Sequence, residues 1–170
     1  MNIKPKLLIV LLLFSNALFG GSSGDFDFWI GHWKVVWEDA EGNNKAGTNE
    51  VSRILDDKIV YEQFDGNPGA PLVGRSWSAY VDKQNLWKQT WVDNNGSYLD
   101  FTGGMRDGQM VLTRKGFVKG KAALQRMRFY NIAEDTLDWV WEVSFDDGKS
   151  WKTAWQIHYT RLNKPDESAP

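Results

Sequence analysis

The feature that most constrains this chain is a short alternation of apolar and polar residues, which restarts about every ten residues from Trp33 onward. A period of two places successive side chains on opposite faces of a β-strand. Turn-forming residues separate the segments, for example at residues 93–96 (DNNG) and 146–148 (DDG), and they tolerate the positive φ that tight hairpins require. The pattern predicts strands joined by consecutive hairpins.

The segments that carry this alternation are 32–38, 46–55, 58–64, 74–82, 86–92, 97–103, 109–115, 122–131, 136–145 and 150–161. The longest break, residues 65–73, holds two prolines and two glycines and predicts a loop. Near the start, residues 26–33 have helical spacing that Gly31 interrupts, which predicts one short helical turn. A meander of this size has two exposed edges, and closure removes both. The sequence therefore predicts an all-β fold, a single antiparallel up-and-down β-barrel of about ten strands.

Residues 1–17 have the three zones of a secretory signal peptide. Lys4 and Lys6 precede an unbroken apolar stretch, and small residues follow it at Ser15 and Ala17. The apolar stretch is about half of the roughly 20 residues that span a bilayer. We therefore expect cleavage after Ala17 and no membrane span afterwards.

The remaining chain is expected to comprise the barrel domain, residues 18–162, and a polar tail, residues 163–170. Export predicts a location in the periplasm or outside the cell. Loss of the two leader lysines and no acid would take the formal net charge from −2 to −4. Because phosphate-rich partners are met by a basic face, nucleic acid is not an expected partner.

Stability must come from packing, because the chain has no cysteine to form disulfides. Its ten tryptophans can supply that packing. Each large aromatic side chain removes on the order of 150 to 250 Å² from water when it is buried.

Gly31-His32-Trp33 and Arg161 resemble the G-x-W tryptophan and the stacking arginine of calycin proteins, the group that includes lipocalins and fatty-acid-binding proteins. The resemblance implies that Arg161 covers Trp33 and closes one end of the barrel. More narrowly, FDFWIGHW, KQTWVDNNGS and WQIHYTR resemble exported bacterial lipocalin-like proteins of unassigned function, over residues 25–162. The chain lacks the helical lid of fatty-acid-binding proteins and the C-terminal helix and disulfide of typical lipocalins, so the resemblance implies no particular ligand.

Alternation assigns inward faces once Arg161 is placed over Trp33. The side chains then predicted to line the lumen and bind a ligand are Trp77, Gln89, Trp91, Trp139, Trp141, Trp155 and Tyr159. Trp151 and Thr153 are expected on the same face as Trp155. A dry core and a ligand cavity both fit this arrangement, and the interspersed polar groups favour the cavity, because buried polar groups need partners that a ligand can supply.

Two functions from different classes fit these residues. The first is an exported binding protein that holds a small, mostly apolar or aromatic molecule in a tryptophan-rich lumen. The second is a small lumen enzyme, such as an isomerase, cyclase or hydrolase acting on a hydrophobic substrate, with Glu62 or Glu142 handling the proton. Arg126 and Arg128 could assist as anion partners or could pair with Glu142 on the outside. A purely structural or surface role also stays open.

No cofactor and no metal are expected. His32 and His158 are the only histidines, and two histidines without cysteine do not supply a structural zinc site. In the haem barrels called nitrobindins a late-strand histidine binds iron, but alternation places His158 on the outer face. Residues 144–151 resemble one Asp box of the sialidase propellers. A single copy cannot build a propeller, so it predicts a hairpin between the last two strands.

Overall fold

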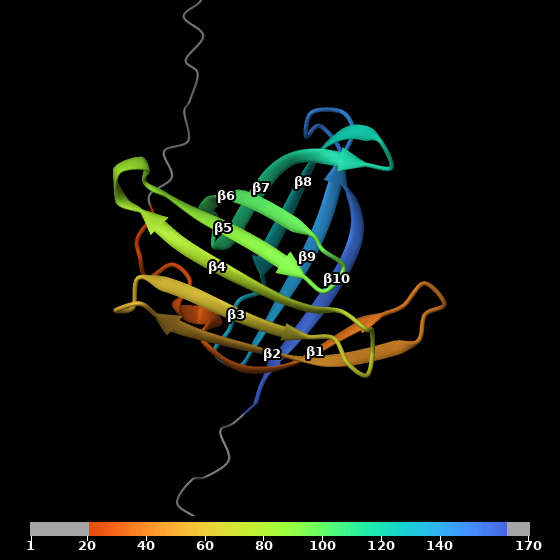
Figure 1. Cartoon of the computed structure of the whole chain (residues 1–170), viewed down its shortest axis with the longest axis horizontal. Helices are drawn as coiled ribbons and strands as arrows, with labels where there is room; N and C mark the ends of the chain where they lie inside the picture. The colour runs from red at the N-terminus through yellow and green to blue at the C-terminus, as the bar shows by residue number, and fades with distance from the viewer. Residues whose placement is uncertain (1–20, 163–170) are drawn as a thin grey trace, which may run out of the picture.

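The computed structural model describes residues 21–162, and within them ten antiparallel strands close into one barrel (Figure 1). The strands are β1 (Gly31–Glu38), β2 (Asn44–Ile54), β3 (Ile59–Asp65), β4 (Val73–Val81), β5 (Leu86–Asp93), β6 (Tyr98–Arg106), β7 (Gln109–Val118), β8 (Lys121–Tyr130), β9 (Thr136–Ser144) and β10 (Lys152–Arg161). Each pairs with its neighbours in sequence, and β1 pairs with β10. The up-and-down barrel expected from the alternation is confirmed.

The expected strand boundaries hold to within one or two residues except in β6 and β7, which are each three residues longer at their C-terminal ends. Gly103 lies inside β6 and Gly116 inside β7. A Cβ atom on Gly103 would lie 1.9 Å from the carbonyl oxygen of Val111 on β7. Glycine therefore permits a close approach of two strands here and does not end one.

The expected signal peptide, residues 1–17, and the tail, residues 163–170, lie outside the described residues. Across the described residues, 21–162, no helix has both the length and the apolar character needed to cross a membrane.

One end of the barrel is covered by residues 21–30, and we call it the closed end. This segment contains the predicted helical turn as a 3-10 helix, η1 (Asp27–Trp29), drawn in orange near the arrowhead of β2 in Figure 1. Phe26 is fully buried, with its ring centroid 4.8 Å from that of Trp87 and 5.6 Å from that of Phe129. The segment therefore fills the barrel end with aromatic side chains.

Arg161 lies over Trp33 at the closed end, as the calycin resemblance implies. Its guanidinium carbon is 4.1 Å from the ring centroid of Trp33. The guanidinium also donates hydrogen bonds to the carbonyl oxygens of Ile30 at 2.7 Å, Phe28 at 3.1 Å and Glu134 at 2.8 Å. One side chain thus joins the covering segment, β1 and the β8–β9 connection.

Gly31 is required by this arrangement. Its φ is +141°, a backbone conformation that residues with a side chain rarely adopt, and a Cβ atom there would lie 2.3 Å from Nη1 of Arg161. The glycine of G-x-W therefore makes room for the arginine that covers the tryptophan.

Three predicted facings are wrong, those of Trp77, Thr153 and Trp151. Trp77 is 40% exposed and contacts Tyr61 on the outer face, whereas Ser76 and Ser78 of β4 are fully buried. The inner face of β4 needs small residues, because a Cβ atom on Gly74 would lie 2.0 Å from the ring of Trp91.

Thr153 is exposed as well, although alternation placed it beside Trp155 inside the barrel. The pairing of β10 with β9 shifts register between Thr153 and Trp155, so a bulge breaks the alternation at that point. Trp151, beyond the bulge, lies under the guanidinium of Arg126, whose central carbon is 4.0 Å from its ring centroid.

Candidate ligand-binding site

A pocket of about 190 Å³ occupies the barrel interior away from the closed end. It reaches from Trp29 of the covering segment to Leu72 and Asp93 at the opposite end of the barrel, which we call the pocket end. The lining residues are Trp29, Glu62, Phe64, Leu72, Gln89, Trp91, Asp93, Leu99, Met127, Phe129, Trp139, Trp141, Trp155, Ile157 and Tyr159.

Aromatic rings form a continuous wall around this pocket. Phe64 and Trp155 have ring centroids 5.8 Å apart with their planes at 86°, and Trp155 and Trp139 meet at 5.8 Å and 85°. Trp91 contacts Phe64 at 6.2 Å, and Trp141 contacts Trp139 at 6.3 Å. The ring quadrupoles favour nearly perpendicular contacts between neighbouring rings, so successive rings along the wall differ in orientation.

These wall tryptophans are not fully packed. Trp91, Trp139, Trp141 and Trp155 are only partly buried, although three strands of the barrel wall present them to the lumen. Trp33 and Trp87, at the closed end, are fully buried. The pocket-end rings therefore retain accessible surface inside the barrel, which a small molecule could cover.

A buried polar cluster stands against the aromatic wall. Glu62 on β3 accepts a hydrogen bond from Asn49 Nδ2 at 2.8 Å through Oε1 and one from Ser76 Oγ at 2.6 Å through Oε2. Asn49 Nδ2 also lies 3.3 Å from the hydroxyl oxygen of Tyr159. Register explains the grouping, since Glu62 lies opposite Ser76 on β4 and opposite Val51 on β2, which shares its face with Asn49 two residues away.

Burial controls the ionisation of this cluster. Removal from water raises the pKa of Glu62 to about 7, although hydrogen bonds from Ser76 and Asn49 and the charge of Arg75 favour its ionised form. Burial, followed by the negative charge of Glu62, raises the pKa of Tyr159 far above its ordinary value. Glu62 is therefore a carboxyl group that gains and loses a proton near neutral pH.

Two further polar side chains line the pocket. Gln89, buried on β5, donates a hydrogen bond from Nε2 to Ser78 Oγ at 2.8 Å. Asp93, at the pocket end, accepts one from Trp91 Nε1 at 2.9 Å. Burial opposes ionisation of Asp93, but hydrogen bonds from Trp91, Ser97 and Asn95 outweigh it and lower its pKa.

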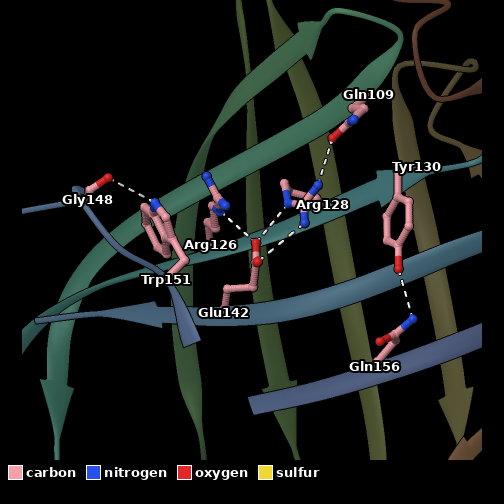
Figure 2. A network of polar contacts seen from close by, with 8 residues as sticks. All are labelled: Gln109, Arg126, Arg128, Tyr130, Glu142, Gly148, Trp151 and Gln156. Atoms are coloured by element: carbon pink, nitrogen blue, oxygen red, sulfur yellow. Dashed lines mark hydrogen bonds and ion pairs between the residues drawn. The ribbon is translucent and has the colours of Figure 1, made fainter. Parts of the chain in front are cut away.

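Glu142 does not share this site. Its carboxylate lies on the outer face of the barrel and accepts hydrogen bonds from Arg126 Nε and Arg128 Nε, each at 2.7 Å (Figure 2). Burial raises the pKa of Glu142, but the two arginines outweigh burial and lower it. The prediction that Glu142 could handle a proton in the lumen is therefore wrong, and the alternative of an outward ion pair is the observed arrangement.

Aromatic rings frame this outer network. The guanidinium of Arg126 lies over Trp151, and that of Arg128 lies over Tyr130, with the carbon 5.2 Å from the ring centroid. Figure 2 shows the network extended by hydrogen bonds to Gln109, Gly148 and Gln156. Arg126 and Arg128 are engaged outside the barrel and take no part in the pocket.

His158 also lies on the outer face, where its Nδ1 is 2.8 Å from Asp138 Oδ1. Within residues 21–162 no group of three or more histidine, cysteine, aspartate or glutamate side chains could hold a metal ion.

The structure thus brings most of the predicted residues to one pocket and separates two of them from it. Those that line it are Glu62, Gln89, Trp91, Trp139, Trp141, Trp155 and Tyr159. Trp77 and Glu142 face outward. Sequence reasoning missed Asn49, Ser76 and Phe64. Alternation along 46–55 places Asn49 on the same face as the apolar Val51, and this pattern could have predicted that Asn49 points into the barrel.

No protein-family model and no curated protein matches this sequence. Among solved structures the fold is similar to that of an S-type phycobiliprotein lyase from Guillardia theta, with a TM-score of 0.52 and 14% sequence identity. The match covers 82% of this chain and 92% of that chain. At this identity the likeness concerns the fold alone, and it supports a calycin-like barrel.

Proposed function

We propose that this chain is an exported binding protein that holds a small aromatic molecule in the tryptophan-walled pocket, with Glu62 as its polar anchor. The observation that carries the proposal is the partial burial of four tryptophans that line one cavity. A ligand would cover apolar ring surface that now lacks a packing partner. Each Å² so covered contributes about 25 cal/mol.

The size of the pocket limits the ligand. An apolar cavity of about 150 Å³ holds a benzene molecule. The pocket here is about 190 Å³, so a molecule with one aromatic ring fits best. A molecule with two rings would fit if part of it extended toward Asp93. Glu62 and Gln89 would then fix its orientation, because a few convergent polar groups in an apolar pocket give specificity.

The first test is native mass spectrometry of the mature protein purified from its own host. A reproducible additional mass on the wild-type chain, lost in Trp155→Ala and Trp91→Ala, is the expected result. Trp77→Ala is the matched control, because Trp77 lies outside the barrel and should leave the additional mass in place. A wild-type chain that carries no additional mass contradicts stable binding.

A second function, a lumen enzyme, is favoured by Glu62 itself. A carboxyl group with a pKa of about 7 is suited to general acid–base catalysis near neutral pH. The structurally similar protein is named a lyase, so an enzymatic role for a barrel of this architecture has a precedent. An enzyme with Glu62→Gln should keep much of its affinity for substrate and lose turnover, whereas a binding protein has no turnover to lose.

Export is tested separately. The intact mass of the chain recovered from the host's periplasmic and culture fractions should correspond to cleavage after Ala17. Recovery of the uncleaved chain from the cytoplasm would refute the exported part of the proposal and leave the binding part standing.

A further inference from the structure

We propose that the ligand of this pocket carries a protonated amine, which the Glu62 carboxylate and the surrounding ring faces recognise together. The inference rests on the proposed binding function and names the chemical class of the ligand. Charge, hydrogen-bonding capacity and ring arrangement support it independently.

The charged side chains that line the pocket are all acidic. Among the described residues that line the pocket, Glu62 and Asp93 are acids and none is a base. The inward-facing Arg114 of β7 does not line the pocket; it lies over the ring of Phe101 and donates a hydrogen bond from Nη1 to Gln125, while its buried Nε has no hydrogen-bond partner among the described residues. A cation therefore meets attraction in this pocket, and an anion meets repulsion.

The polar cluster has hydrogen-bond acceptors to spare. Each carboxylate oxygen of Glu62 accepts one hydrogen bond from protein and can accept another. The carbonyl oxygen of Asn49, whose amide group is bonded to Glu62, is buried and has no hydrogen-bond partner among the described residues. An ammonium group has three donors and no acceptor, so it would satisfy acceptors of this kind.

The aromatic wall suits the same group. Trp139, Trp155 and Phe64 all line the pocket and meet nearly at right angles, so aromatic rings border it in more than one orientation. The face of an aromatic ring is negative, and a cation within about 6 Å of it is stabilised by about 0.5 to 2 kcal/mol. Tryptophan is the strongest of these rings, and five tryptophans line the cavity.

Binding would be linked to the proton on Glu62. The groups that act on this carboxyl group are Asn49 from β2, Ser76 from β4 and Tyr159 from β10, together with the charge of Arg75, which belongs to the opposite face of β4. Of these only Arg75 is cationic, and it donates hydrogen bonds to the carbonyl oxygens of Phe64 and Gly74. An ammonium ligand would bind the ionised form of Glu62, whose fraction rises with pH.

The test uses three probes of one shape and different charge, namely phenethylamine, phenethyl alcohol and phenylacetate. Affinities are measured by titration calorimetry on the full mature chain freed of any co-purified molecule. The wild type should bind the amine about tenfold more tightly than the alcohol, and the acid more weakly than the alcohol. In Glu62→Gln the preference for the amine over the alcohol should largely disappear.

Glu142→Gln is the matched control, because it removes an equally buried carboxylate on the outer face of the wall. It should leave all three affinities unchanged. A measurement on the wild type alone covers the case in which Glu62→Gln does not fold. With a Glu62 pKa of about 7, affinity for the amine should rise about tenfold from pH 6 to pH 8 while that for the alcohol stays constant.

Equal binding of the amine and the alcohol, or tighter binding of phenylacetate, would overturn the inference and leave the binding function intact. Failure of all three probes to bind would also overturn it. The mass-spectrometric test would then decide separately whether the barrel holds some other molecule.

Discussion

At the closed end of the barrel Trp33 and Trp87 are completely buried, whereas at the pocket end Trp139 and Trp155 keep part of their rings accessible inside the lumen. All four residues are tryptophans, and the side chains of all four point into the barrel. Their burial differs because the side chains that surround them differ. Residues 21–30 fill the closed end with the buried Phe26 and Trp29, whereas at the other end the β3–β4 loop contributes the partly buried Ala70 and Leu72 and leaves a pocket. One barrel thus contains a core and a cavity built from the same amino acid.

The strongest test of this comparison truncates one tryptophan at each end. Trp87→Ala should lower the free energy of unfolding by about 4 kcal/mol, because it opens a void in a packed core. Trp155→Ala should cost only about 1 to 2 kcal/mol, because its ring already borders a cavity. Urea denaturation of both variants measures the difference. Equal losses would contradict the division into core and cavity.

Arg161→Ala tests the closure of the packed end. The variant loses three hydrogen bonds to backbone carbonyls and the cover over Trp33, so we expect a loss of about 3 kcal/mol in unfolding free energy. Thr160→Ala, an exposed neighbour on the same strand, is the control and should change little. Unchanged thermal stability in Arg161→Ala would show that this end does not depend on the arginine.

Glu62→Gln tests the polar cluster of the pocket end through pH. The folded pKa of Glu62, about 7, is above its ordinary value of 4.5, so the native state binds more protons than the unfolded state in that interval. Stability contributed by Glu62 is therefore greatest at low pH and is lost as pH rises toward 7. Between pH 5 and pH 7.5 the wild type should lose about 2 to 3 kcal/mol relative to Glu62→Gln. Parallel pH profiles for the two proteins would refute the burial of a titrating carboxyl group.

Glu142→Gln carries the smallest expected effect and sharpens the comparison between the inside and the outside of one wall. Loss of charge weakens the hydrogen bonds from Arg126 and Arg128, which should lower the unfolding free energy by about 1 to 2 kcal/mol. The loss should be similar at pH 6 and pH 8, because the arginines keep the pKa of Glu142 below its ordinary value. A change in ligand affinity would contradict the outward placement.

The sequence predicted the strands well because alternation and turn residues are local signals. By alternation within each strand, anchored on Arg161 for the last one, it also placed six of the seven predicted ligand-binding residues on the inner face. Counting failed at Thr153, where a bulge of β10 interrupts the period. It failed at Trp77 because Trp77, Ala79 and Val81 share one face of β4 while the face that is buried carries the polar Ser76 and Ser78, so the hydrophobic pattern favoured the wrong face.

The chemistry of the site depended on contacts between strands. Asn49, Glu62 and Ser76 belong to three different strands, and only the register between those strands brings their side chains together. The pKa of Glu62 follows from its burial, which no local pattern encodes.

By itself, then, the sequence determined the barrel and its strand order, because hydrophobic periodicity and turn chemistry act over a few residues. The pairing of Trp33 with Arg161 was implied by the resemblance to calycin proteins. The tertiary structure alone decided which tryptophans form a core and which border a cavity, and which of two glutamates is buried beside that cavity. Those outcomes depend on how much space neighbouring strands and the covering segment leave unfilled, and that space is a property of the closed barrel as a whole.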